Sequence, residues 1–443
     1  MENILFETTS LCPACFEVIE AQYKVIDNKV YFCKACPQHG YFQTLFWADA
    51  DLFQKWTRQS VHADRFVAGT KKEKGCPFDC GLCNEHEGGV CTAVLEVTYR
   101  CNLACNICFA DTEKAQFDPT LDEIKTMYET AQKYGGDCSI QISGGEPTVR
   151  EDLEDVLRMG KQMGFSHIQV NTNGVRLAAE SDYAQKLKAA GADLIYLQFD
   201  GANDAIYEKI RGKKLLDVKK QAIENCRRAQ IGVLLVPTVI PNVNLDHLGQ
   251  IIAFAKENMP VVKGVHFQPV SYFGRFDTVS PTDEERCSLS DVMHELEKQT
   301  DGEMKIKHFV PRKRYDAHCA FSSLFYLSEQ GRLHAITEEE QNAKAPEHRA
   351  FEKKANAFTN AYWRISAEEQ ESNGVSEEMR KFKNRLKNYT LAVSGMGFQD
   401  VWNIDISRLR GCCVQVISNQ GSAIALCAFH VTDQEGKRLY ENR

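Results

Sequence analysis

The sequence lacks any uninterrupted apolar run long enough for a transmembrane helix, which needs about 20 apolar residues. It also lacks a basic excess: 53 Lys and Arg stand against 61 Asp and Glu, for a formal net charge of −8, so no basic field argues for nucleic acid. The N-terminus, MENILFETTSLCPAC, has no basic segment followed by an apolar one and therefore does not look like a secretory signal. We expect a cytoplasmic protein with no nucleic-acid partner and no transmembrane segment, and we leave peripheral membrane contact open.

Cysteine, by contrast, is abundant, with 18 among 443 residues. Most cysteines in the first quarter of the chain fall in C-x-x-C or C-x-x-x-C clusters. Without an export signal, this spacing favours metal sites in a reducing compartment over a disulfide framework. The length is sufficient for two or three domains with a substantial core.

Two C-x-x-C knuckles, joined by an insert of hairpin length, stand near the N-terminus. Their thiols belong to Cys12, Cys15, Cys33 and Cys36. Four thiolates can close tetrahedrally around zinc or around a single iron, as in rubredoxin, and the sequence does not separate these two metals. A ribbon that binds nucleic acid is disfavoured, because the segment lacks dense Lys, Arg and aromatic residues.

A second cysteine group has the spacing C-x-x-x-C-x-x-C, with a fourth cysteine shortly after it. It consists of Cys76, Cys80, Cys83 and Cys91. Four thiolates can saturate a [4Fe–4S] cluster, which would then carry electrons or brace the fold. A second zinc site is the alternative.

A third group, Cys101, Cys105 and Cys108, follows the apolar run from Val94 to Val97. The run predicts a strand, so the three thiols are expected on the loop after its carboxyl end, where ligands bind in α/β sheets. Three thiolates suit an iron–sulfur cluster that keeps one iron open to a small chelating ligand. Three cysteines with a remote fourth ligand also describe a structural zinc.

From Leu95 onward, the hydrophobic pattern alternates between strands and helices. The predicted helices cover residues 120–134, 152–164, 183–190, 217–230 and 245–258. The predicted strands after the first cover residues 139–143, 167–170, 194–199, 232–240 and 265–268, and each ends in Gly, Asn, Asp or Pro. This pattern predicts about six βα units in a parallel sheet with right-handed crossovers, and strand ends at which the backbone can approach a ligand.

The cysteine loop, followed one βα unit later by Ser143-Gly-Gly-Glu-Pro147, resembles the radical S-adenosylmethionine (SAM) superfamily. The resemblance implies an α/β fold with a partial (β/α)6 barrel and a [4Fe–4S] cluster on Cys101, Cys105 and Cys108. It further implies that this cluster binds SAM and cleaves it to a 5′-deoxyadenosyl radical. One departure is Ile107, where many members carry an aromatic residue; here the aromatic residue is Phe109.

The same resemblance implies positions around SAM. Ser143, Gly144, Gly145, Glu146 and Pro147 would hold its methionyl end. Asn171 and Asn173 would lie near the sulfonium and carboxylate, and Gln198 and Asp200 near the ribose. Segments 236–240 and 266–269 would border the adenine and the substrate.

A narrower resemblance comes from the order of the motifs: a rubredoxin-like double knuckle, then the second cysteine group, then the SAM loop. This order is similar to the class D radical SAM methyltransferases, which include tetraether lipid synthase and pterin-methylating enzymes. The group carries a further cluster near its C-terminus, for which Cys319, Cys412 or Cys413, and Cys427 are candidates; buried free thiols are the alternative. The implied domains are 1–50 (metal knuckles), 51–92 (linker with the auxiliary cluster motif), 93–275 (radical SAM core) and 276–443 (α/β extension).

These observations predict an enzyme that abstracts hydrogen from an unactivated carbon, leading to methylation or carbon–carbon bond formation on a lipid- or pterin-like substrate. Its cofactors would be SAM, the SAM-binding cluster, additional [4Fe–4S] clusters and one mononuclear Fe or Zn, with ferredoxin or flavodoxin as reductant. One alternative is a radical SAM oxidase acting on a peptide or small molecule. A non-enzymatic multi-zinc scaffold would explain the knuckles but not the Gly-Gly-Glu-Pro motif or the βα series.

Overall fold

The computed structural model describes residues 3–56, 68–110, 118–276, 280–312, 316–337, 363, 365 and 376–440. Its N-terminal part is a four-stranded antiparallel sheet in the order β1-β2-β3-β4. The strands are β1 (Asn3–Leu11), β2 (Val18–Ile26), β3 (Lys29–Cys36) and β4 (Gly40–Trp47). Asp27 and Asn28 both have positive φ at the tip between β2 and β3, as a two-residue hairpin turn requires. Helix α1 (Ala50–Lys55) follows, with Asp49 capping its first turn.

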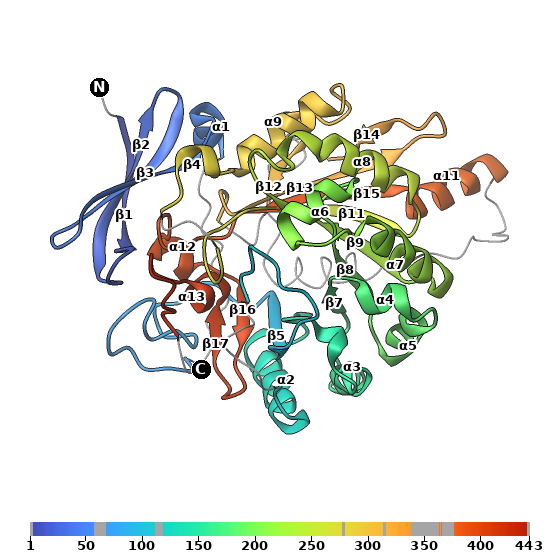
Figure 1. The fold of residues 1–443 in the computed structure, drawn as a ribbon, viewed down its shortest axis with the longest axis horizontal. Coiled ribbons are helices and arrows are strands. Elements are labelled where there is room, and N and C mark those ends of the chain that lie inside the picture. The colour runs from blue at the N-terminus through green and yellow to red at the C-terminus, as the bar shows by residue number, and fades with distance from the viewer. Residues whose placement is uncertain are drawn as a thin grey trace.

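The next part is a run of six parallel strands that pair in the order of the chain. They are β5 (Thr92–Thr98), β6 (Ser139–Gly144), β7 (Ile168–Thr172), β8 (Leu194–Gln198), β9 (Gly232–Val236) and β11 (Val262–Pro269), with the short β10 (Thr238–Val239) beside β11. The helices between them are α2 (Leu121–Gly135), α3 (Leu153–Gln162), α4 (Val175–Ala179), α5 (Tyr183–Ala190), α6 (Asp204–Arg211), α7 (Leu216–Ala229) and α8 (Leu248–Glu257). Helices α2 to α8 lie along the outside of the curved sheet (Figure 1). The structure confirms the predicted α/β partial barrel.

The residues after 275 add strands to the same sheet on both sides of this run. β15 (Thr390–Met396) pairs in parallel with β11, and β16 (Val414–Ile417) pairs in parallel with β5. The other elements here are α9 (Leu289–Gln299), β12 (Val310–Pro311), β13 (Ala320–Leu327), β14 (Leu333–Ala335), α11 (Glu377–Asn388), α12 (Ile406–Arg410), β17 (Ala423–Ala425) and α13 (Leu426–His430). The C-terminal extension therefore flanks the barrel at both of its edges.

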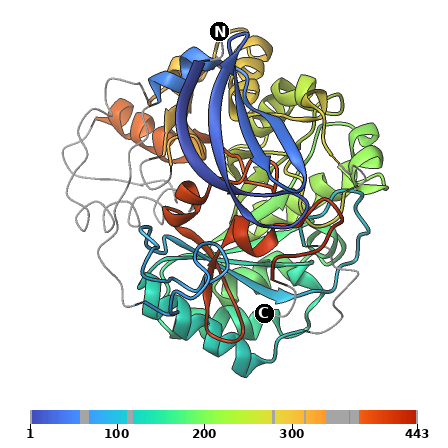
Figure 2. The same ribbon diagram turned by 90° about the vertical axis from the view of Figure 1, so that its left-hand side faces the viewer.

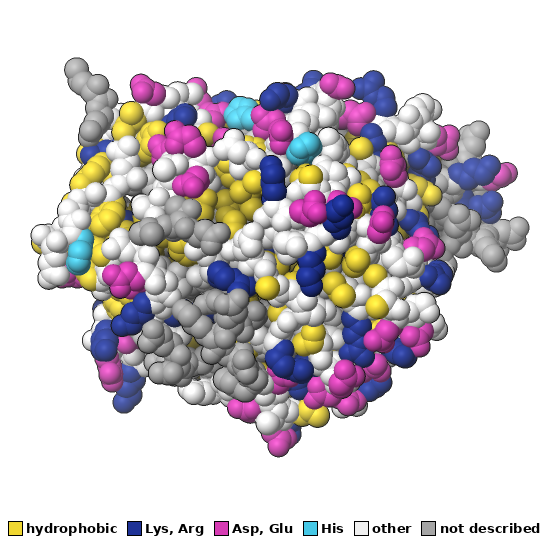
Figure 3. Space-filling view, viewed as in Figure 1, with side chains coloured by type: hydrophobic (Ala, Val, Ile, Leu, Met, Phe, Trp, Pro, Cys, Tyr) yellow, Lys and Arg dark blue, Asp and Glu magenta, His cyan; other side chains and the backbone are white. Residues whose placement is uncertain are grey.

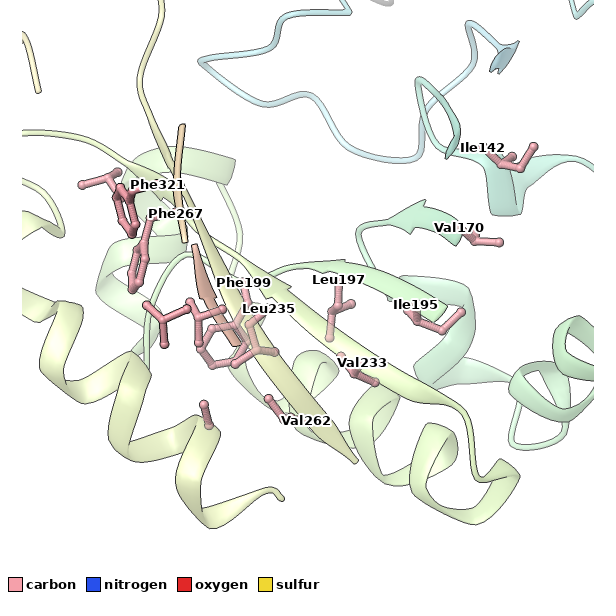
Figure 4. Packing of buried hydrophobic residues seen from close by; sticks show 14 of the residues in the cluster. Ile142, Val170, Ile195, Leu197, Phe199, Val233, Leu235, Val262, Phe267 and Phe321 are labelled. Carbon is pink, nitrogen blue, oxygen red and sulfur yellow. The ribbon is translucent and has the colours of Figure 1, made fainter. Parts of the chain in front are cut away.

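The barrel strands are apolar on the face that meets the helices. Ile140, Ile168, Ile195 and Val233 are fully buried on four successive strands. Figure 4 shows further members of this core, among them Ile142, Val170 and Leu235. On β6 and β7 the residues one position away are polar, as the next subsection describes. This period-2 alternation fixes which face of each strand meets the helices.

The N-terminal sheet is held against the C-terminal extension by buried polar contacts. Asp405 accepts 2.8 Å hydrogen bonds from Tyr23 Oη and from Thr8 Oγ1. The Lys34 ammonium donates to the carbonyl oxygens of Leu11 and Val401. Figure 2 shows the blue N-terminal strands beside the red C-terminal helices.

The visible surface mixes charges of both signs, without a basic field (Figure 3). Within the described ranges, no helix has the length and hydropathy that crossing a membrane requires.

Candidate active site

The inner face of the barrel encloses a cavity of about 720 Å³. Parallel strands covered on both faces are usually apolar throughout, but here three strands, β6, β7 and β8, carry polar residues on their inner face. These residues and their immediate neighbours that line the cavity are Ser139, Gln141, Ser143, His167, Gln169, Asn171, Asn173, Tyr196 and Gln198. Inward residues of β5 and β9, among them Val94, Leu234 and Val236, are apolar. The barrel interior is therefore a cavity with one polar wall, on β6 to β8, instead of a packed core.

The loop after β5 brings Cys101, Cys105 and Cys108 to the wall of this cavity, as the sequence predicts. Cys108 and Arg275 exchange backbone hydrogen bonds of 2.9 and 3.0 Å, which anchor the end of the loop. Burial, with Glu146 and the other two thiols, raises the pKa of Cys101 to about 11. Three thiols that share one cavity wall form a donor set that fits an iron–sulfur cluster with one iron left open to the cavity.

The glycine motif lies at the end of β6, directly beside the end of β5. Gly144 has a φ of +115°, and a Cβ atom there would lie 2.2 Å from the carbonyl oxygen of Thr98. Gly145 N–H donates to that same oxygen at 2.8 Å, and Glu146 N–H donates to the Arg100 carbonyl at 2.9 Å. Only glycine permits this approach of the two strand ends, which brings the motif to the cysteine loop.

The Glu146 carboxylate is buried and accepts four hydrogen bonds from the protein. Oε1 receives Thr148 N–H, Thr148 Oγ1 and Thr172 Oγ1, and Oε2 receives Asn173 N–H at 2.6 Å. Glu146 is the carboxylate expected near the methionyl group of SAM. Its hydrogen bonds also tie the end of β6 to the end of β7. Pro147 starts the short 3-10 turn η1 (Pro147–Val149) that positions Thr148.

Asn171 and Asn173 follow each other on the inner face of β7. Asn171 Nδ2 donates to Ser143 Oγ at 3.3 Å, while its Oδ1 is buried with no hydrogen-bond partner among the described residues. Asn173 Nδ2 donates to Asn102 Oδ1 at 2.7 Å, which links β7 to the cysteine loop. Both asparagines line the cavity at the position expected for SAM.

Gln198 and Asp200, expected at the ribose, belong to a buried charge network. The Asp200 carboxylate accepts hydrogen bonds from Nε and Nη2 of Arg211, at 2.8 and 2.9 Å, and from Nε2 of Gln198. Lys219 donates to Gln198 Oε1 at 3.0 Å, and burial lowers its pKa to about 8. The Asp200 carboxylate is fully buried in this ion pair and is not among the described residues that line the cavity; its contact with the ribose stays a prediction.

Sequence reasoning missed Arg211 and Lys219, because both lie in segments with an ordinary amphipathic helix pattern. Arg211 lines the cavity and interacts electrostatically with Cys105 of the cysteine loop. In the second predicted substrate segment, His266 receives or donates a 2.8 Å hydrogen bond with Ser394 Oγ, and burial lowers its pKa to about 3. The imidazole is therefore neutral in the cavity wall.

The N-terminal metal site has a ligand set different from the predicted one. Among the described residues, the thiols of Cys12, Cys15 and Cys36 gather with His39 Nδ1, all within 4.8 Å of one another. Cys33 is instead buried on β3, where its Sγ lies 3.9 Å from Gln43 Oε1. Side chains alternate between the faces of a strand, so Cys33 and Cys36 point to opposite sides of β3. Three thiolates and one imidazole fit a tetrahedral zinc or iron ion.

The second cysteine group is only partly assembled as predicted. Cys76, Cys80 and Cys83 border one small pocket, together with His86 and Arg410. Cys91 is not among the residues that border this pocket; a disulfide joins it to Cys413, at the point where β5 and β16 are neighbouring strands.

The three C-terminal candidates, Cys319, Cys412 and Cys427, share one neighbourhood. Burial raises the pKa of Cys427 to about 12, and the nearby Cys319 adds to this shift. Cys412 interacts electrostatically with Cys427 and Cys319, and also with Cys80 of the second group. Arg408 Nη2 lies 2.9 Å from the sulfur of Cys319. Cys412 thus stands between the two predicted auxiliary sites.

Comparisons with known proteins agree with this geometry. Residues 95–255 match the family model of the radical SAM superfamily, and residues 4–48 match the model of the HMPTM N-terminal zinc ribbon domain. The 7,8-dihydro-6-hydroxymethylpterin dimethyltransferase of Methanocaldococcus jannaschii is 34% identical over 479 residues, covering 97% of this chain and 94% of that protein. A probable GTP 3′,8-cyclase of Methanococcus aeolicus is 27% identical over 226 residues, covering 50% of this chain and 71% of that protein.

Two solved structures match parts of the chain. Streptococcus suis SuiB bound to its precursor peptide SuiA matches with a TM-score of 0.40 and 14% identity, over 49% of this chain and 46% of that chain. The native enzyme anSMEcpe with bound AdoMet matches with a TM-score of 0.37 and 14% identity, over 67% of this chain and 95% of that chain.

Proposed function

The chain belongs to the radical SAM superfamily and, within it, to the group of pterin-methylating enzymes, and from this premise we propose that it abstracts hydrogen from a reduced pterin and methylates it. The similarity to the pterin dimethyltransferase runs over nearly the full length of both chains. It therefore includes the strands of the cavity as well as the cysteine loop.

The observation that carries the proposal is the meeting of the cysteine loop and the glycine motif at one end of the cavity. A [4Fe–4S] cluster on Cys101, Cys105 and Cys108, when bound, supplies the electron that cleaves SAM to a 5′-deoxyadenosyl radical. The residues of the chain hold SAM and substrate and exclude water, because a free radical is quenched where solvent enters. Gly144 lets the end of β6 approach Thr98 at the end of β5, beside the cysteine loop, and Glu146 ties the end of β6 to the end of β7.

The polar side chains on the inner face of β6, β7 and β8 favour a pterin over a lipid. A lipid chain requires a long apolar tunnel, whereas Gln141, Gln169, Tyr196 and Gln268 present polar groups to this cavity. The N-terminal sheet matches a zinc ribbon, which does not support a peptide-docking role. An external reductant such as ferredoxin or flavodoxin completes the proposal.

Deuterium transfer tests this function without requiring the methyl donor to be known. Anaerobically reconstituted protein would receive SAM, dithionite and 7,8-dihydro-6-hydroxymethylpterin deuterated at its sp³ carbons. We expect deuterium in the released 5′-deoxyadenosine, and no 5′-deoxyadenosine from a Cys101→Ala, Cys105→Ala, Cys108→Ala variant. Release of 5′-deoxyadenosine without deuterium would exclude the pterin as hydrogen donor.

A further inference from the structure

Two glutamines lie side by side in the barrel, one pleat deeper than the residues expected around SAM. Gln141 on β6 and Gln169 on β7 are direct partners in the strand register. They precede Ser143 and Asn171, respectively, by two residues on the same inner face. With a rise of about 3.3 Å per residue, this places them about 7 Å along the strands from Ser143 and Asn171, the residues expected around SAM.

The two amides face the cavity with their hydrogen-bonding groups uncommitted. Both side chains line the cavity and keep some exposure within it, and neither makes a hydrogen bond or ion pair with any described residue. Each carboxamide offers two N–H donors and one oxygen acceptor. Because polar groups inside proteins are almost always satisfied, these amides require water or a ligand as partner.

The wall around the glutamines limits the kind of ligand that fits. Glu146 is the single carboxylate among the described residues that line the cavity, and Arg211 and Arg312 are its cations. The carboxylate already accepts four hydrogen bonds, and Arg211 is paired with Asp200. On β8, Tyr196 also lines the cavity; it is paired in register with Asn171, two residues after Gln169, and its ring is 5.7 Å from the His266 ring. This wall suits a flat, neutral heterocycle with donors and acceptors along one edge.

We propose that Gln141 and Gln169 determine substrate specificity by hydrogen bonding the lactam edge of the pterin, with its face against Tyr196. This assignment rests on the proposed function, since the lactam edge belongs to the pterin ring. A carboxamide pair can match both the N–H and the C=O of a lactam, which a carboxylate cannot. Neutral groups thereby recognise the pterin. They lie two residues along their strands from Ser143 and Asn171, which are expected to contact SAM.

The test is the affinity of holoenzyme, with SAM bound, for 7,8-dihydro-6-hydroxymethylpterin by anaerobic equilibrium dialysis. We expect Gln141→Leu and Gln169→Leu each to weaken pterin binding about tenfold or more, because each leaves a polar group of the ring unpaired. Gln169→Glu keeps the volume but cannot donate, and should weaken binding as well. A pterin methylated at N3 should show a much smaller difference between wild type and Gln169→Leu.

Gln162→Glu, on the exposed last turn of α3, is the matched control and should bind like wild type. SAM affinity and iron content verify that each variant is folded and loaded. Wild-type pterin affinity in both leucine variants would overturn the specificity assignment and leave the proposed function standing. A wild-type holoenzyme that binds SAM but no pterin would overturn both.

Discussion

The ammonium group of Lys219 lies 2.5 Å from the carbonyl oxygen of Asn173, although 46 positions separate the two residues in the chain. Because the same group also donates to Gln198, one buried cation joins the ends of β7 and β8. We expect Lys219→Met to weaken SAM binding by about tenfold or more, since hydrogen bonds from charged donors contribute about 1.5–3 kcal/mol each. Equilibrium dialysis with SAM at matched iron content measures this.

The neighbouring Lys220 provides the control, because its side chain is 54% exposed and its nearest acid, Asp217, is 4.0 Å away. Lys220→Met should bind SAM like wild type. Equal SAM affinity in the Lys219 and Lys220 variants would show that Lys219 does not position the SAM site.

The ribbon metal should depend on His39 and not on Cys33. His39→Ala removes one of four clustered ligands, so we expect loss of the zinc or iron that is not part of a cluster. Cys33→Ala removes a buried thiol from the opposite face of β3 and should retain the metal. Metal analysis of the two variants decides the ligand set; retention in His39→Ala with loss in Cys33→Ala would restore the four-thiolate site.

Iron stoichiometry tests the auxiliary sites. If the SAM loop and both auxiliary groups hold [4Fe–4S] clusters, reconstituted protein should carry about twelve cluster irons. Replacing Cys76, Cys80 and Cys83 by Ala should remove about four irons and leave SAM binding intact. A native content of about four irons, with zinc in the remaining sites, would make the auxiliary groups structural zinc sites.

His266 should make stability depend on pH below neutrality. Burial lowers its pKa to about 3 in the folded protein, against an ordinary value of about 6.5. The unfolded state therefore binds the proton first, and stability falls as pH decreases below about 6.5. Between pH 7 and pH 5 the loss should be about 2 kcal/mol.

His266→Asn lacks this titration. Between pH 7 and pH 5, the unfolding free energy of wild type should therefore fall by about 2 kcal/mol more than that of the variant. Anaerobic urea unfolding at pH 5, 6 and 7 measures it. A difference that stays constant with pH would contradict a buried neutral imidazole.

The sequence predicted the βα series closely because each strand and helix carries its own period. The helix expected at 183–190 coincides with α5, and the strand expected at 232–240 breaks at Pro237, which cannot donate a ladder hydrogen bond. The short helices α4 and α6 were not predicted; the five residues of α4 make little more than one turn. The pairing of β16 with β5 joins residues more than 300 positions apart, and no local pattern encodes such a contact.

In the site, the cysteine loop and the glycine motif could be predicted because each is a short motif with a recognisable spacing. Both line the cavity in the structure. His39 was missed as a ligand although it stands three residues after Cys36, a spacing typical of metal ligands. The glutamines carried a signal too: a polar residue within each apolar strand indicates a polar face. The partner of Cys91 was not predictable, because it depends on which strand covers the edge of β5.

The position of β15 and β16 has a consequence for how the protein is made. A nascent chain that ends before Thr390 has the whole six-stranded run but leaves β5 and β11 as unpaired edges. The strands that cover these edges are synthesised after the run. We therefore expect the edge of β5, next to the cysteine loop, to stay unpaired during synthesis until Val414–Ile417 has been made. Truncation near the C-terminus should accordingly give an aggregation-prone chain, because exposed edge strands recruit other strands.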